Sequence, residues 1–263
     1  MFHTTSDKQQ LYYEVHGNDE SDKCLVFLNG LSQSTIAWGF MIPQFHDYKV
    51  VLLDFIFQGQ SDKKGDLRNF DQHADDVNGL LSSLNIDKAT LIGISYGSLV
   101  AQHFALNHAD KLDKLILLST FAHKTPYFNA IEVAWFGALE AGGYPLMFDI
   151  MLPTVLGEEY FDKPLIAIDA LRASRQNANT DATALKKLMM ATHEREDYRK
   201  KLSAIKTSTL IIHGEKDALL PLHMGKAVND AIPGSKFEII INSGHTLNLE
   251  AIPQTIKLIK EFI

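Results

Sequence analysis

The chain has 263 residues, the size of one large domain or of one domain with an insertion. Hydrophobic residues make up 46% of it and charged residues 22%, as in ordinary globular proteins, and the formal net charge is -7. This negative balance argues against a nucleic-acid partner, because nucleic-acid phosphates attract basic surfaces.

The N-terminal residues, the lengths of the apolar stretches and the cysteine count indicate the cellular compartment of the protein. The N-terminus, MFHTTSDKQQ, lacks the basic-then-apolar pattern of a secretory signal, and no apolar stretch approaches the ~18 residues of a membrane span. A single cysteine, Cys24, excludes an internal disulfide, and its place in the apolar run CLVFL indicates a buried strand thiol. We expect a cytoplasmic protein with no membrane span, either a monomer or a homodimer.

Short runs of apolar and β-branched residues recur along the chain and predict strands. The first of them, at 11–15, alternates between apolar and polar residues. The others are almost continuously apolar, and they lie at 24–28, 49–54, 89–94, 112–119, 209–214 and 236–241. Continuous runs are typical of strands buried on both faces, as in a parallel sheet.

Segments with helical periodicity lie between several of these runs, at 70–84, 98–106 and 253–262. Pro253 opens the last of them, where proline favours a helix start. Strand–helix alternation predicts βαβ units, and therefore an α/β fold with a doubly wound, mostly parallel sheet.

The alternation stops between about Ala122 and Ser203, where no strand-like run occurs. The segment 131–161 is apolar and aromatic, and 180–202 has the pattern of a helix. We predict a helical cap at 122–203, inserted between a first core segment at 1–121 and a second at 204–263.

The stretch GISYG at 93–97 matches the motif G-x-S-x-G, with Ser95 at its centre. It follows a predicted buried strand and precedes a predicted helix, which is the strand–turn–helix context that a nucleophile elbow requires. Gly93 and Gly97 remove side chains that would collide with neighbouring backbone, and the helix N-terminus directs its amides at the site.

Two further strands end in residues that complete this chemistry. Asp217 follows the strand at 209–214, and His245 follows the strand at 236–241. Ligands bind beyond the carboxyl ends of strands in α/β sheets, so we expect Ser95, Asp217 and His245 to form a catalytic triad. A serine needs the histidine as base, and the histidine needs the carboxylate to hold its tautomer.

An oxyanion hole is also expected. One donor is the backbone N–H of Tyr96, the residue after the nucleophile, and the other is the N–H of Leu31, after the sharp turn that Gly30 permits. His213 is interpreted as structural, and Asp54 and Asp62 as turn residues.

These residues resemble the α/β-hydrolase fold superfamily, in its capped serine hydrolases, over nearly the whole chain. The motifs that carry the resemblance, in family order, are NG at 29–30, DFIFQGQSD at 54–62, GISYG at 93–97, HGEKD at 213–217 and SGH at 243–245. The resemblance implies that residues near 122–203 are the cap and that Ser95, Asp217 and His245 are the triad.

Two positions depart from the family pattern. The family usually has His where this chain has Asn29, and Gly where it has Phe57. Asn29-Gly30 together with Phe57, Gly59, Gln60 and Ser61 is locally similar to the rhamnolipid-precursor acyltransferases. These acyltransferases join hydroxyacyl chains carried on acyl carrier protein.

Substrate contacts are expected from Asn29 and Gly30 and from cap residues, where flexible methionines suit varied apolar chains. The cap residues are Trp135, Phe136, Met147 and Met151, and Phe148 and Leu152 belong to the same apolar group. Packing of the cap onto the core is the competing explanation for these side chains. No metal cluster is evident, and the chemistry requires no cofactor.

The leading hypothesis is a serine hydrolase that cleaves a carboxylic ester or thioester with an apolar acyl group, either a small molecule or carrier-bound. A serine at position 95 argues against dehalogenases and epoxide hydrolases, which use a carboxylate nucleophile. One alternative is an acyltransferase with a hydroxyacyl acceptor, and another is a catalytically slow protein that senses a small molecule. Hydroxynitrile lyases and cofactor-free oxygenases, which share the triad, are minor alternatives.

Overall fold

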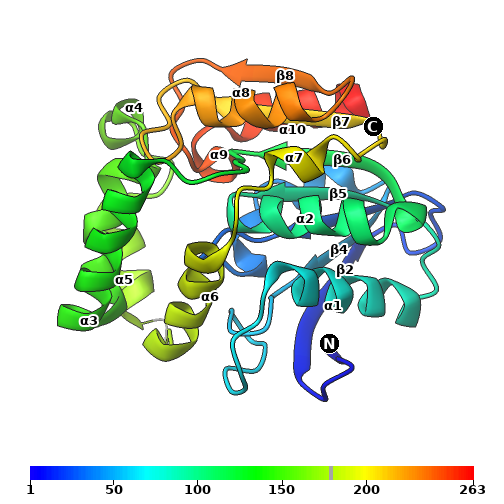
Figure 1. Ribbon diagram of the computed structural model, residues 1–263, viewed down its shortest axis with the longest axis horizontal. Helices are drawn as coiled ribbons and strands as arrows, with labels where there is room; N and C mark the ends of the chain where they lie inside the picture. Colours follow the sequence, from blue (N-terminus) through cyan, green and yellow to red (C-terminus); the bar gives the residue numbers. More distant parts are fainter. Residues whose placement is uncertain (178–179) are drawn as a thin grey trace.

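The computed structural model describes residues 1–177 and 180–263 and shows one mixed eight-stranded sheet in the order β1-β2-β4-β3-β5-β6-β7-β8 (Figure 1). The six strands β4, β3, β5, β6, β7 and β8 are neighbours in that order and pair in parallel. At the β4 edge, β2 pairs antiparallel with β4, and β1 pairs antiparallel with β2. Their bounds are β1 Phe2–Thr4, β2 Gln10–Gly17, β3 Cys24–Leu28, β4 Lys49–Leu53, β5 Ala89–Ile94, β6 Leu112–Leu118, β7 Thr209–Gly214 and β8 Lys236–Ile240. The predicted α/β class with a mostly parallel sheet is confirmed.

Helices cover both faces of this sheet. One core cluster joins one side of the strands to α1 (Phe70–Ser83), α2 (Tyr96–Asn107) and α8 (Leu222–Ala231). The other joins the opposite side to α10 (Ile252–Phe262) and to two short 3₁₀ helices, η1 (Thr35–Trp38) and η2 (Ile42–Phe45). Alternate residues of each buried strand enter different clusters, because successive side chains of a strand point to opposite faces.

A helical insertion, here defined as helices α3–α7, connects β6 to β7. It lies beside the sheet at the end where α2 begins (Figure 1). Its helices are α3 Pro126–Val155, α4 Glu158–Asp162, α5 Ile168–Asn177, α6 Ala182–Glu194 and α7 Arg199–Leu202. Gly143, at φ 67, kinks α3 just before Pro145.

The structure also corrects several expectations. The predicted helix at 180–202 is two helices, α6 and α7, separated by the segment 195–198. The strand expected at 236–241 to be buried on both faces is an edge strand, β8, with Ile239 and Ile241 exposed. The helix α8 was not predicted. β1 and the short helices η3 (Ala109–Lys111) and α9 (Leu247–Glu250) were also not predicted, because segments of three or four residues are too short to show a periodic pattern. Within the described residues, no helix is long and apolar enough to cross a membrane.

Candidate active site

Ser95 occupies a strained turn between β5 and α2. Its backbone has φ 50 and ψ -114, a conformation that L-residues rarely adopt, and its N–H donates to Leu118 O at 3.0 Å. A Cβ on Gly93 would lie 2.4 Å from Gly97 O, and one on Gly97 would lie 2.3 Å from Leu28 O. The two glycines are therefore required by close backbone approach, and together they present Ser95 at the helix N-terminus.

A buried row of polar side chains supports the carbonyl side of this turn. The Ser98 hydroxyl lies 2.5 Å from Ser95 O and 2.8 Å from Thr120 Oγ1, and the Gln102 amide donates to the same Thr120 oxygen at 2.8 Å. Arg195, which follows α6, donates to Gln102 Oε1 at 2.7 Å. Hydrogen bonds alone thus connect the end of the insertion to the turn that carries Ser95.

Asp217 and His245 form a buried pair on the neighbouring loops. His245 Nδ1 lies 2.8 Å from Asp217 Oδ2, and Leu220 N–H donates to Asp217 Oδ1 at 2.8 Å. The Asp217 side chain is fully buried. Each carboxylate oxygen thus has a partner, which fixes Nε2 of His245 as the nitrogen left for a reacting group. Ser119 Oγ also donates to His245 O at 2.7 Å and holds the backbone of the histidine.

His213 lies behind this pair, at the end of β7, and is fully buried. Its Nε2 lies 2.6 Å from Leu220 O and 3.4 Å from Asp217 Oδ2. Burial lowers the pKa of His213, so the ring is neutral near pH 7 and donates to the Leu220 carbonyl. His213 therefore orients the Asp217 loop and does not face the cavity.

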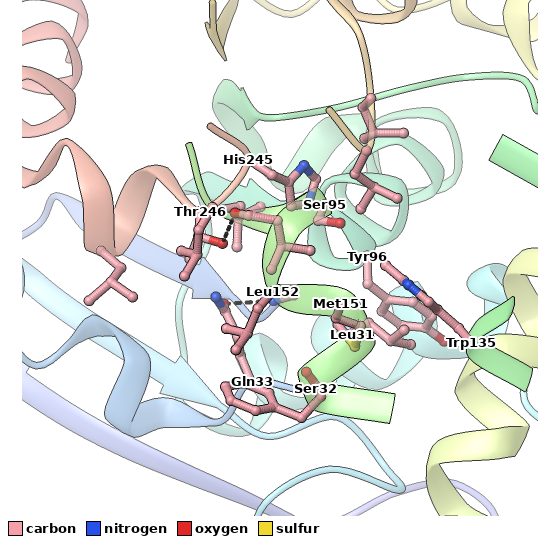
Figure 2. Close-up of a pocket in the computed structure, with 18 of the residues that line it drawn as sticks. Leu31, Ser32, Gln33, Ser95, Tyr96, Trp135, Met151, Leu152, His245 and Thr246 are labelled. Atoms are coloured by element: carbon pink, nitrogen blue, oxygen red, sulfur yellow. Dashed lines mark hydrogen bonds between the residues drawn. The ribbon is translucent and has the colours of Figure 1, made fainter. Parts of the chain in front are cut away.

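Ser95 and His245 line one cavity of about 120 Å³ between the sheet and the insertion (Figure 2). No hydrogen bond joins their side chains within the described residues, which is common before a substrate is bound. The wall is mostly apolar and contains no Lys, Arg, Asp or Glu, and its polar side chains besides Ser95 and His245 are Ser32, Gln33, Thr192 and Thr246. Such a lining favours an uncharged, apolar group of the ligand next to the serine.

Leu31 and Tyr96 also line the cavity, beside Ser95. Among the described residues, the backbone N–H groups of Leu31 and Tyr96 donate no backbone hydrogen bond in a turn, loop or cap. The neighbouring Gly30 N–H, in contrast, is taken by Gln33 Oε1 at 3.0 Å, and Gln33 contacts Asn248 at 3.3 Å. Gln33 therefore braces the loop that carries Leu31 against the segment that follows His245.

A family model described as alpha/beta hydrolase fold matches residues 23–252. The chain belongs to this family. The relatives of this α/β hydrolase include the AB hydrolase superfamily protein YisY of Bacillus subtilis (strain 168), 29% identical over 90% of each chain. A 2-hydroxymuconate semialdehyde hydrolase of Pseudomonas sp. (strain CF600) is 23% identical over 91% of this chain and 86% of its own.

Among solved structures, a thermophilic esterase from Thermogutta terrifontis aligns with this α/β hydrolase at a TM-score of 0.87. It is 26% identical, and the alignment covers 99% of this chain and 96% of that one. The family match includes the strands from β3 to β8 and the whole insertion, so the hydrolase fold and family are established for both.

The two departures from the family pattern have different structural explanations. Asn29 is fully buried, donates to Leu53 O at 2.8 Å and to Asp54 Oδ1 at 3.1 Å, and accepts from Trp38 Nε1 at 2.9 Å. It joins two loops of this α/β hydrolase and does not line the cavity, so its expected contact with substrate is not seen.

Phe57 has φ 81, in the region that glycine adopts without cost. The ring is buried, and Lys187 Nζ of α6 lies 4.8 Å from its centroid. A bulky residue in this conformation costs about 1–3 kcal/mol, which ring burial and the cation–π contact offset. Phe57 thereby joins the loop after β4 to the insertion.

The expected substrate contacts from the insertion separate into two groups. Trp135 and Met151 line the cavity, and so do Phe148 and Leu152. Phe136 and Met147 do not, and Met147 is fully buried inside the insertion. Sequence patterns missed Phe121, Phe128 and Leu171 from the insertion side and Thr246 and Leu249 from the histidine loop, because none belongs to a motif.

No group of three or more His, Cys, Asp and Glu side chains in the described ranges could hold a metal ion. Cys24 lies at the start of β3, and burial raises the pKa of its thiol to about 12. The thiol is therefore protonated near neutral pH and is a poor nucleophile.

Proposed function

We propose that this α/β hydrolase cleaves carboxylic esters or thioesters with an uncharged, apolar acyl group, through an acyl-enzyme on Ser95. The observation that carries the proposal is the cavity that Ser95 and His245 line, whose wall is mostly apolar and free of Lys, Arg, Asp and Glu. An acyl chain that bears a carboxylate would have no cation to pair with in this wall.

In the proposed mechanism, Ser95 Oγ attacks the acyl carbon while His245 Nε2 accepts the hydroxyl proton. Asp217 holds the imidazole in the required tautomer and stabilises the imidazolium that forms. The N–H groups of Leu31 and Tyr96 bind the developing oxyanion, each contributing about 3 kcal/mol to the transition state. His245 then protonates the leaving alcohol or thiol, and water activated by the same histidine releases the acid.

Ser95→Ala tests this proposal directly. We expect wild-type protein to be labelled by a fluorophosphonate and to hydrolyse p-nitrophenyl esters, in a series from acetyl to dodecanoyl, with a maximum set by the cavity. The alanine variant should lose both properties, with kcat reduced by roughly four orders of magnitude or more. Equal labelling of the two proteins, or no labelling of wild type, would exclude the triad mechanism.

Acyl transfer is the second candidate, and a second cavity of about 140 Å³ favours it. This cavity shares Leu31, Ser32 and Gln33 with the first and is lined by polar groups of Ser34, Gln58, Lys63 and Asp181. A polar alcohol fits such a lining, either as the leaving group of a hydrolysed ester or as an acceptor that replaces water. Acyl glycerol formed from a p-nitrophenyl ester in dilute glycerol, at a yield above the glycerol-to-water ratio, would favour transfer.

A further inference from the structure

One carboxylate binds the backbone on both sides of His245. Glu250, the last residue of α9, accepts the N–H of Gly244 on Oε2 at 3.0 Å and the N–H of Thr246 on Oε1 at 2.9 Å. These two donors belong to the residues on either side of the histidine. One side chain therefore holds the backbone on both sides of His245, in addition to the hydrogen bond from Ser119 to the His245 carbonyl.

The same carboxylate also binds the insertion. Glu250 Oε2 accepts the N–H of Gly157 at 2.7 Å, and Gly157 is the residue that precedes α4. Thr246 adds two contacts to the end of α3, because its N–H and its hydroxyl both donate to Val155 O, at 3.2 and 2.8 Å. Residues from both sides of this junction, His245, Thr246 and Val155 among them, line the cavity.

The junction leaves no space for side chains on its two glycines. A Cβ on Gly244 would lie 2.3 Å from Gly157 N, and one on Gly157 would lie 3.0 Å from Gly244 N. The backbone of the insertion therefore rests directly on the backbone of the histidine loop. A carboxylate between them can reach donors on both.

Glu250 has no Lys or Arg partner among the ion pairs of the described residues. Burial raises its pKa, and the three N–H donors act in the opposite direction, as does the nearby His245. The backbone amides, and no cationic side chain, are thus the groups that hold this carboxylate.

We propose that Glu250 is a positioning residue, which holds His245 in its reactive orientation and sets the insertion over it through Gly157. The effect of Glu250 on turnover rests on the proposed function, the hydrolysis of esters or thioesters. Its structural part, the clamp on three amides, stands independently. Loss of the clamp should reduce kcat through His245 and raise KM through the loosened wall of the cavity.

Glu250→Gln tests the clamp with almost no change of shape. The glutamine side chain has an NH₂ group in place of one carboxylate oxygen of Glu250. At least one of the three backbone N–H groups therefore faces a donor and loses its acceptor. We expect kcat per active site, titrated with fluorophosphonate, to fall about tenfold for acetyl and octanoyl esters alike. KM should rise only for octanoyl esters, because these alone contact the Val155 side of the wall. Glu250→Ala, which removes every acceptor, should produce a larger loss.

Glu132→Gln is the control, because Glu132 is a buried glutamate, whereas Glu250 is half-buried, and Glu132 pairs with His193 in the insertion, away from the cavity. Its kcat should equal that of wild type. A kcat for Glu250→Gln within twofold of wild type, or an equal loss in Glu132→Gln, would overturn the positioning role.

Amide hydrogen exchange distinguishes failure of the clamp from failure of the proposed function. In Glu250→Gln, peptides that contain Gly157 and Gly244–Thr246 should exchange faster, while α1 and α2 stay protected. This readout needs no turnover. If wild type hydrolyses no ester but the exchange changes as expected, the proposed function is wrong and the clamp holds. Unchanged exchange in both peptides would exclude the clamp.

Discussion

At the carboxyl end of the sheet, backbone segments touch one another, whereas the outer side of the insertion faces open space. Gly97 illustrates the first region, since a Cβ there would lie within 2.7 Å of the backbone oxygens of Leu28 and Asn29. Gly137 of α3 illustrates the second, since nothing lies within 4 Å of the same atom. The turns at the end of the sheet can accept almost no change, and the outer side of the insertion can accept many, although the sheet and the insertion together wall one cavity.

The largest test of this contrast is Gly97→Ala against Gly137→Ala. The Gly97 variant must displace backbone, so we expect a loss of about 3 kcal/mol in the free energy of unfolding and about a hundredfold loss in kcat/KM. Gly137→Ala should gain up to about 1 kcal/mol, because alanine favours an exposed helix position. Urea unfolding and ester kinetics measure both. Tolerance of alanine at Gly97 would break the comparison.

Acid should weaken the core through His73, which is fully buried, has no hydrogen-bond partner among the described residues and lies against Phe55 and Tyr96. Burial lowers its pKa from 6.5 to about 3. As pH falls below 6.5, the unfolded chain takes up the proton first, so protonation favours unfolding.

We therefore expect His73 to cost wild type about 2–3 kcal/mol between pH 6.5 and 4.5. Urea titrations of wild type and His73→Leu at both pH values measure this difference. The leucine variant should lose less stability on acidification. Identical pH dependence of the two proteins would show that His73 is not the group responsible. His103, whose pKa burial lowers to about 4, contributes in the same direction and remains in both proteins.

The smallest expected effect lies in the insertion and concerns specificity. Met151→Ala enlarges the cavity and should shift the preferred acyl chain to a longer one, with about a tenfold change in the ratio of kcat/KM between dodecanoyl and hexanoyl esters. Met147→Ala removes the same side chain four residues away, outside the cavity. It should lower stability and leave the chain-length profile unchanged. An equal shift in both variants would mean that general loosening, and not the wall, sets specificity.

Most of the sheet was predictable because its strands are buried and therefore read as apolar runs. The bounds expected for the strands Cys24–Leu28, Ala89–Ile94 and Thr209–Gly214 are those of the structure. The strand Lys236–Ile240 misled the prediction, because an edge strand can carry isoleucines on its exposed side. The family and the mostly parallel sheet are both confirmed. They could be predicted because the motifs at strand ends depend on local backbone geometry, which a few residues determine.

The sequence by itself determined which strand each candidate residue follows, the turn at Ser95 and the family, because glycines and polar residues at strand ends are local requirements. Only the tertiary structure decided the rest. It placed Trp135 and Met151 at the cavity and Met147 away from it, and it brought Glu250, which binds two amides of its own loop, to the distant amide of Gly157. Helical periodicity specifies that a residue is buried, but the partner that buries it depends on how the insertion rests on the sheet.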